Sequence, residues 1–389
     1  MRVTADPDGL GLASVPFPKS SLLKLELSDS FNHMILPSSL PDSITVLTLG
    51  FYYNQPINVN TLPKSLNTLT FGQKYRFNSI IAPDSLPHTL IQLKFGKIFS
   101  KLTDKLLSSL PMLNSLSFGF GIVGPLTPGS LPPSLQTLDI ERSPRLIVDD
   151  PQSIPPALTK LSVFAQSQVS PFPLHLLSLR IYEIDDITLV PGSLPSSLTE
   201  LIIVSRIKIV LSPGSLPQSL QSLILSGRMD QELAQGTLPP SLTLLCLPDN
   251  CTLNIVDTIP LGLRSLSIAG VHLVKYFEQL THLEHVELKL PCDLDDTNIS
   301  TLKCNRLKFT VKSIYVDCDP SMDFTFATRT TTPDELLAVI TRAIRAFPNV
   351  DTFEVVQELH STHLIRAIDN NQFLHLHSNH SFKLITLSS

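Results

Sequence analysis

Histidine is the residue type whose distribution along the chain most suggests chemistry. The chain has 11 histidines, and three of them, His375, His377 and His380, lie close together near the C-terminus. Along an extended strand, His375 and His377 share one face, with His380 close behind. Zinc accepts three imidazoles as ligands. However, no His-Glu-x-x-His spacing and no cysteine cluster accompanies them, so the sequence favours structural or solvated histidines. We therefore expect no metal and no cofactor.

A second chemical pattern is the Gly-x-Gly-x-x-Gly spacing at 119–124, which is typical of dinucleotide sites. It follows an expected strand. Pro125 and Pro128 come next, in place of a helix whose N-terminus would hold a pyrophosphate. We interpret these residues as turn glycines. Since the sequence also has no Gly-x-Ser-x-Gly elbow, phosphate loop or kinase catalytic loop, we expect that the chain is not an enzyme.

Composition and charge narrow the class of partner. The 389 residues carry a net charge of −5, and 16% are charged, below the roughly 25% of an average globular protein. This balance argues against nucleic acid, because phosphates are bound by clusters of lysine and arginine. No apolar run approaches the roughly 18 residues needed to span a bilayer, so we expect no membrane span.

The cysteines and the N-terminal residues bear on the cellular compartment. The 5 cysteines match no zinc or redox spacing. The first residues lack the apolar core of a secretory signal, because 6–9 (DPDG) interrupt it. Reduced thiols without a secretion signal predict a cytoplasmic protein.

The elements that would position these residues come from an internal repeat. The pattern Ser-Leu-Pro-x-Ser-Leu-x-x-Leu recurs with small changes, as in SLPDSITVLTL from Ser39, TLPKSLNTLTF from Thr61 and SLPHTLIQLKF from Ser85. Its central leucine returns about every 22 residues, a period typical of solenoids. These anchor leucines are Leu25, Leu47, Leu69, Leu93, Leu116, Leu138, Leu161, Leu179, Leu201, Leu223, Leu245 and Leu266.

Each repeat carries the pattern of a short strand with one buried face. In the third repeat, Leu69 and Phe71 alternate with Thr68 and Thr70. The preceding proline, Pro63, cannot donate a backbone hydrogen bond, so it marks the corner at which the chain turns into the strand. The remaining residues leave no room for a full helix and are expected to be extended or 3-10.

Because one unit cannot bury its leucines alone, the units must stack. The expected fold is a repeat solenoid, a leucine-rich-repeat-like curved β-solenoid of about 12 coils. A parallel sheet is expected on its concave face, and the convex face is expected to be poor in helix.

One stretch of the repeats resembles a known family. The segment YNQPI at 53–57, followed by TLPKSLNTLTFG at 61–72, is similar to the FNIP repeats of social amoebae and some giant viruses, and the pairs Phe31-Asn32 and Phe77-Asn78 flank it. The resemblance covers about 15–290 and implies a variant of the leucine-rich repeat. After the third unit the Phe-Asn pair fades. The later signature is Pro-Gly-Ser-Leu-Pro, at 128–132, 191–195 and 213–217.

Beyond about residue 290 the Leu-Pro signature stops and the pattern changes. The periodicity predicts a helix at 333–347 and a short helix near 362–368. The predicted strands are 307–316, 350–356, 373–376 and 382–387. Such an α/β unit would cap the exposed end of the last coil. The expected domains are an N-terminal segment without cap or signal at 1–20, the repeat solenoid at 21–290, and an α/β C-terminal capping region at 291–389.

The positions on either side of each anchor leucine are expected to face outward from the sheet. Through the eighth unit they are polar or charged, with the exception of Val46. In units nine to eleven they become apolar, and an exposed apolar strip marks a partner site. The alternative is that these are residues tolerated on a sheet or covered by the C-terminal region. The strip consists of Ile202, Ile224, Leu244 and Cys246.

Together these features predict a non-enzymatic scaffold that binds another protein on the concave face. A first alternative is recognition of a carbohydrate or small ligand on that face, but the absence of Trp and an aromatic content of 6% leave few rings for stacking. A second alternative is an enzyme in the C-terminal region, for which Asp351, His360, His363 and the later histidines offer material.

Overall fold

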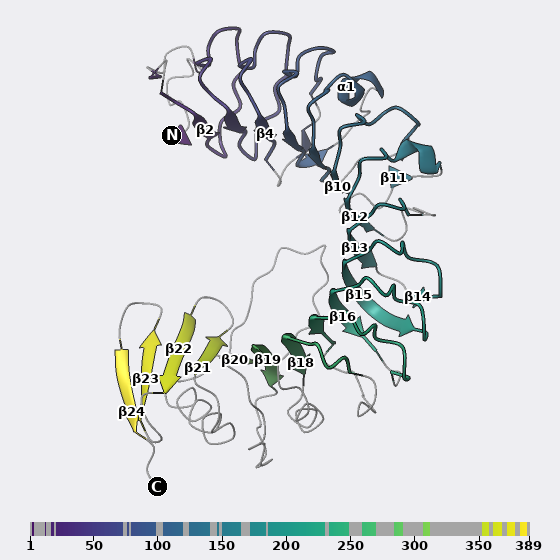
Figure 1. Cartoon of the computed structure of the whole chain (residues 1–389). Coiled ribbons are helices and arrows are strands. Elements are labelled where there is room, and N and C mark those ends of the chain that lie inside the picture. The colour runs from purple at the N-terminus through teal and green to yellow at the C-terminus, as the bar shows by residue number, and fades with distance from the viewer. Residues whose placement is uncertain are drawn as a thin grey trace. The chain divides into compact units, whose positions relative to one another are not determined.

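The computed structural model describes the greater part of the repeats and several strands beyond them (Figure 1). The helix expected at 333–347 and His380 lie outside the described residues. The chain divides into two compact units, Met1–Glu183 with Ser193–Val204, and Ile184–Gly192 with Ser205–Ser389. The described residues are 2–3, 12, 17–18, 21–72, 76–77, 79–98, 104–119, 124–140, 146–147, 150–164, 172–183, 186–229, 233–248, 259–269, 284–290, 306–311, 352–357, 361–367, 372–377 and 382–386.

In the first unit, strands one coil apart pair in parallel and in register. Leu25 lies opposite Leu47 and Leu47 opposite Leu69, and the register continues to the pair Leu161 and Leu179. Each of these anchor leucines is at most 2% exposed. The paired strands are β2 (Lys24–Leu27), β3 (Val46–Thr48), β4 (Thr68–Thr70), β6 (Gln92–Lys94), β8 (Ser115–Ser117), β10 (Thr137–Asp139), β12 (Lys160–Phe164) and β13 (Ser178–Glu183).

Short additional strands extend this unit. β1 (Arg2–Val3) pairs in parallel with β2, so the sheet begins before residue 21. On the return path of the coils, β5 (Arg76–Phe77) pairs with β7 (Lys97–Ile98), and β9 (Gly124–Pro125) pairs with β11 (Leu146–Ile147). The return path is thus largely extended, as expected for coils too short to hold a full helix.

The second unit continues the same pattern and then changes direction. β14 (Ile187–Leu189) pairs with the end of β15 (Glu200–Leu211). A parallel series runs through β16 (Ser222–Arg228), β17 (Leu244–Cys246), β18 (Ser265–Ala269), β19 (His285–Leu290), β20 (Arg306–Val311) and β21 (Thr352–Gln357). Three antiparallel strands follow, β22 (Ser361–Ala367), β23 (Gln372–His377) and β24 (Phe382–Thr386).

The short helix expected near 362–368 is wrong, because β22 occupies that stretch. Its backbone pairs with β21 on one side and β23 on the other. An isolated helix of two turns is marginal in water, whereas a strand between two partners satisfies its backbone groups on both edges.

The chain is a parallel β-solenoid of about nine turns with a 22-residue period and little helix. Within the described part, helical structure is limited to α1 (Asp104–Ser108) and short 3-10 turns such as η2 (Pro151–Ser153). The expected number of 12 coils, the concave placement of the sheet and the C-terminal cap stay predictions.

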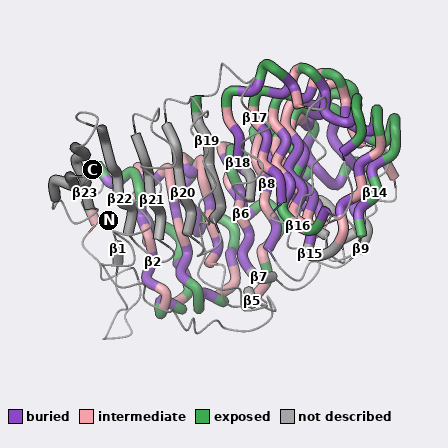
Figure 2. The backbone as a smooth tube through the Cα atoms, turned by 90° about the horizontal axis from the view of Figure 1, so that it is seen from below, coloured by how far each residue is buried: buried purple, intermediate pink, exposed green. Residues whose placement is uncertain are grey.

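Stacked side chains form the core behind the anchor leucines. Two residues after the anchors of three successive coils, Phe71, Phe95 and Phe118 are each 1% exposed. The ring centroids of Phe71 and Phe95 lie 5.3 Å apart, and those of Phe95 and Phe118 lie 5.8 Å apart with nearly parallel planes. In Figure 2, buried residues recur along each coil of the repeats. This column of rings is therefore a continuous part of the core.

A residue with a positive φ lies three positions before the proline of seven Leu-Pro corners, and this explains the change of signature along the chain. Asn60 has φ 62° and Asp84 has φ 58°, whereas Gly129 takes the same position with φ 78°. In this last turn the N–H of Ser130 donates to the carbonyl of Thr127 at 3.0 Å. Proline followed by glycine at the two central positions is typical of a type II turn. The Pro-Gly signature therefore replaces Asn or Asp in one and the same turn.

Where a serine follows the proline corner by two residues, it joins neighbouring coils. Its hydroxyl donates to the carbonyl of a residue 21 positions earlier: Ser65 to Ile44 at 2.8 Å and Ser134 to Leu113 at 2.8 Å. Thr89 makes the equivalent bond to Leu66 at 2.9 Å. The second serine of Ser-Leu-Pro-x-Ser-Leu is thus retained for a hydrogen bond between coils.

A side-chain ladder also connects the coils on the return path. The N–H of Asn54 donates to Oδ1 of Asn32 at 2.8 Å, and the N–H of Ser79 donates to Oδ1 of Asn54 at 3.1 Å. Where the Phe-Asn pair has faded, Oδ1 of Asp186 accepts from the N–H of Lys208 at 3.0 Å. An aspartate therefore supplies the same acceptor later in the chain.

The aromatic partners of this ladder are buried. The rings of Phe31 and Tyr53 stack at 6.3 Å with nearly parallel planes, and Tyr53 is 4% exposed. Desolvation by burial raises the pKa of the Tyr53 hydroxyl well above its usual value. Tyr53 therefore stays protonated throughout the physiological pH range.

Candidate partner-binding face

The outward positions of the first unit are polar except at Val46 and Ile202, and some of these polar side chains contact one another along the sheet. Lys24 Nζ lies 2.8 Å from Glu26 Oε1, and both side chains are well exposed. The hydroxyl of Ser117 lies 3.1 Å from Asp139 Oδ2 on the neighbouring strand. Exposed pairs of this kind contribute little to stability. The polar face of this unit is thus solvated and offers hydrogen-bonding groups to a partner.

In the second unit the outward positions become apolar on β16 and β17. Ile224 lies directly opposite Cys246, and Leu244 precedes Cys246 by two residues on the same face of β17. All three side chains are half-buried, and the Cys246 thiol is free. The structure thus brings together three of the four residues of the predicted strip, and we call them the apolar patch.

Serines border the apolar patch along the sheet. Leu244 lies between Ser222 on β16 and Ser265 on β18, and Cys246 lies opposite Ser267 on β18. The six outward positions of these three strands hold no charged side chain. An apolar group placed here meets a neutral surface.

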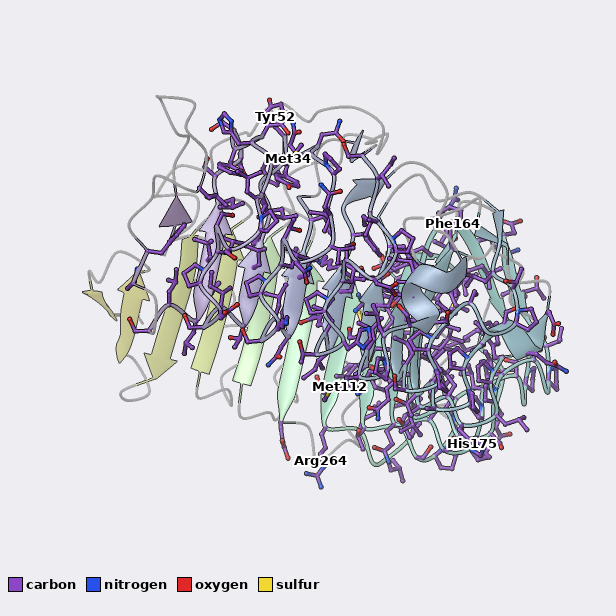
Figure 3. All side chains as sticks on the ribbon, turned by 90° about the horizontal axis from the view of Figure 1, so that it is seen from above. Met34, Tyr52, Met112, Phe164, His175 and Arg264 are labelled. Carbon is purple, nitrogen blue, oxygen red and sulfur yellow. The ribbon has the colours of Figure 1, made fainter. Side chains whose placement is uncertain are left out.

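A polar rim runs beside the apolar patch, two residues before the anchor leucines. Thr243, Arg264 and Glu284 follow one another in this column. The N–H of Thr243 donates to the carbonyl of Gln221 one coil earlier, that of Arg264 to the carbonyl of Thr243, and that of Glu284 to the carbonyl of Arg264. Arg264 Nη1 lies 3.3 Å from Glu284 Oε1. In Figure 3 the Arg264 side chain projects from the ribbon. The sequence-based prediction missed this rim because that prediction considered only the positions adjacent to each anchor leucine. The opposite charges of Arg264 and Glu284, 20 residues apart, were the signal that could have revealed it.

Ile202, the fourth residue of the predicted strip, differs from the others. It lies on the part of β15 that belongs to the first unit and is only 9% exposed. It therefore offers little surface to a partner in this structure.

The described residues were also compared with what metal binding, membrane crossing and dinucleotide binding require. Among side chains that the structure describes, no group of three His, Cys, Asp or Glu residues is arranged to hold a metal ion. No helix in the described ranges has both the length and the apolar character needed to cross a membrane. The glycine motif at 119–124 leads into β9, a two-residue strand that ends at Pro125.

The fold and its coil chemistry define a leucine-rich-repeat-like parallel β-solenoid. The model of the FNIP repeat family matches the chain at four places, residues 17–52, 31–74, 53–98 and 187–228. The chain thus carries FNIP repeats at these four places. The fourth match begins one residue after Asp186 and includes its partner Lys208, so the repeat is found beyond the units with an intact Phe-Asn pair.

Two solved structures are similar to the chain. One is the crystal structure of CroV588, described as a novel circular LRR protein, with 25% identity, a TM-score of 0.36, and coverage of 77% of this chain and 58% of that one. The other is the Drosophila Toll–Spatzle complex, with 14% identity, a TM-score of 0.45, and coverage of 79% of this chain and 43% of that one. The chain thus spans about half the length of these proteins. No curated protein matches it in sequence.

Proposed function

We propose that the chain is a non-enzymatic scaffold that binds another protein through the outward, concave face of its parallel sheet. The observation that carries this proposal is the apolar patch of Ile224, Leu244 and Cys246, at positions that are polar in the first unit except at Val46 and Ile202. A partly exposed apolar centre with a polar border is the usual anatomy of a protein interface.

The size of the patch limits its role. A stable interface buries about 1,200–2,000 Å² in total, far more than three half-buried side chains supply. The apolar patch would therefore act as the anchor, with the Arg264–Glu284 rim and the serines as its border. Because few residues of an interface carry most of the binding energy, changes at the anchor should dominate.

The chemistry of the face also indicates the kind of partner. It lacks the lysine and arginine clusters that bind phosphates, and the chain carries a net charge of −5. The proposed partner is a protein with an apolar side chain at its contact point, in the cytoplasm, and neither nucleic acid nor a membrane.

The proposal is tested by affinity purification from the native cell followed by mass spectrometry. The test variant carries Ile224→Asp and Leu244→Asp, which place two carboxylates in the apolar patch. The matched control carries Thr68→Asp and Thr70→Asp on β4, two outward positions that are already polar. We expect a protein recovered with the wild type to be lost with the test variant and retained with the control.

The same experiment can contradict the proposal. Equal recovery with the test variant, at unchanged thermal stability, would exclude the apolar patch as the anchor. Loss of the partner with both variants would show that binding does not depend specifically on the apolar patch, and would also contradict the proposal.

The contribution of Ile202 needs a milder change. Because Ile202 is 9% exposed, an aspartate there would bury a charge and destabilise the coil. Ile202→Thr keeps the β-branched shape, and we expect it to weaken partner binding less than the two substitutions in the apolar patch.

A further inference from the structure

The antiparallel strands at the end of the second unit bring three histidines onto one face. His363 on β22 lies directly opposite His377 on β23. His375 precedes His377 by two residues, so alternation places it on the same face, opposite Ile365. The proposed partner-binding face does not use these histidines.

The register sets the spacing of the three positions. Residues directly opposite across antiparallel strands have Cβ atoms about 4.5–5.5 Å apart, and residues two apart on one strand are separated by about 6.8 Å. Zinc bound by histidine has zinc–nitrogen distances of about 2.0–2.1 Å, so one ion needs histidines at closely spaced positions. Two register positions on one strand and a third on its neighbour make such a compact set.

This set differs from the three histidines that lie close together in the sequence. Spacing along the chain groups His375 and His377 with His380, whereas strand pairing groups them with His363, which is 12 residues before His375. The hairpin between β22 and β23 thus supplies the third position.

The residues at the neighbouring register positions indicate which class of ion would bind. Val355 on β21 lies opposite His363, and Lys383 on β24 lies opposite His375. Oxygen-binding cations such as magnesium and calcium find no carboxylate at these positions, whereas nitrogen ligands suit zinc and its neighbours in the first transition series. Lys383 places a positive charge on the same face and should weaken binding of a cation.

We propose that His363, His375 and His377 form a binding site for one zinc-class divalent ion, with the remaining coordination position left to water or a further ligand. The site is independent of the proposed partner-binding face, and its ions are Zn²⁺, Co²⁺, Ni²⁺ or Cu²⁺.

The test uses the full chain, freed of metal with a chelator and then titrated with Co²⁺ and with Zn²⁺. We expect one ion per chain, with the visible absorption of nitrogen-ligated Co²⁺. Each of His363→Ala, His375→Ala and His377→Ala should weaken Zn²⁺ binding by at least about 100-fold, because loss of a ligand exceeds the 10–100-fold typical of a supporting group. Lys383→Met should tighten binding.

Two control variants separate this site from other arrangements. His380→Ala and His175→Ala should leave Zn²⁺ affinity unchanged; His175 is exposed in the repeats. If His380→Ala abolishes binding and His363→Ala does not, the register-based set is wrong. Absence of stoichiometric binding in the wild-type chain also overturns the proposal.

A measurement on the unmutated chain covers the case in which a variant fails to fold. Histidines are modified with diethylpyrocarbonate with and without Zn²⁺, and the modified positions are located by mass spectrometry. Protection of His363, His375 and His377 but not of His380 supports the site, and protection of none of the three contradicts it.

Discussion

At the scale of single residues, Asn32 shows how one side chain joins two coils. Its Oδ1 accepts a hydrogen bond from the N–H of Asn54 at 2.8 Å and another from Nε2 of Gln55 at 3.3 Å. Asp186 does the same for the N–H of Lys208 at 3.0 Å. The requirement at this position is thus a side-chain oxygen acceptor close to the backbone, and asparagine is not the only residue that meets it.

Substitution of Asn32 tests this requirement. Asn32→Ala removes the acceptor for one loop amide and should lower the free energy of unfolding by about 0.5–1.5 kcal/mol. Asn32→Asp keeps an oxygen at the same place and should have a clearly smaller effect. Urea unfolding followed by circular dichroism measures both, and equal losses for the two variants would show that the acceptor is not what matters.

The turn glycine Gly129 makes a second prediction at this scale. It has φ 78°, and a Cβ added there would meet no atom within 4 Å. A side chain at this position therefore lowers the free energy of unfolding only through the unfavourable backbone conformation, by about 1–2 kcal/mol for an ordinary residue. Gly129→Val should incur that cost or more, whereas Gly129→Asn should be milder, since Asn60 occupies the equivalent turn with φ 62°. A thermal melt in which asparagine proved as destabilising as valine would contradict this interpretation.

At the scale of elements, the short strands follow directly from sequence. Alternation around each anchor leucine places one residue of every pair in the core, and the structure has Leu69 fully buried between half-buried Thr68 and Thr70. The proline corners could be predicted because proline has no N–H to donate. The turn chemistry was less accessible, since serine, asparagine, aspartate and glycine all appear at the position with positive φ.

The helix expected near 362–368 shows where local pattern fails. β22 is held by pairing with β21 and β23, and its residues become neighbours only after the chain reverses twice. A window of seven residues cannot predict a strand that depends on pairing with other segments of the chain. The same holds for the pairing of His363 with His377.

The column of phenylalanine rings gives the prediction that belongs to this scale. Phe95 is 1% exposed and stacks with Phe71 on one side and Phe118 on the other. Phe95→Ala should lower the free energy of unfolding by about 3–5 kcal/mol through lost burial and the cavity left behind. Phe95→Leu should cost much less, because Leu49 and Leu225 fill the same position in other coils. Chemical denaturation of both variants measures the difference, and similar losses would show that ring packing is not the source of stability.

At the scale of the whole molecule, repetition determines which parts of the candidate face could be predicted. A 22-residue period by itself places Ile224 and Cys246 on neighbouring strands, and the parallel register confirms that they are direct neighbours. The burial of Ile202 and the rim formed by Arg264 and Glu284 could not be predicted in the same way. They depend on the course of β15 and on side chains outside the alternation. Regularity thus predicts columns of residues, and departures from it mark the surface that we propose binds a partner.

The central claim is that residues one period apart lie opposite each other on neighbouring strands and so form one column on the sheet, and the native Cys246 allows a direct measurement. Neighbouring strands lie about 4.8 Å apart, which suits the Cα separation of about 4.4–6.8 Å in a disulfide. In the variant Ile224→Cys, the new thiol lies opposite Cys246. In the control Ser222→Cys, it lies diagonally at about 8 Å, beyond the reach of a disulfide. After mild oxidation and peptide mapping, we predict the 224–246 crosslink in high yield and no 222–246 crosslink. A preferred 222–246 crosslink, or no crosslink in a folded Ile224→Cys variant, would contradict the account.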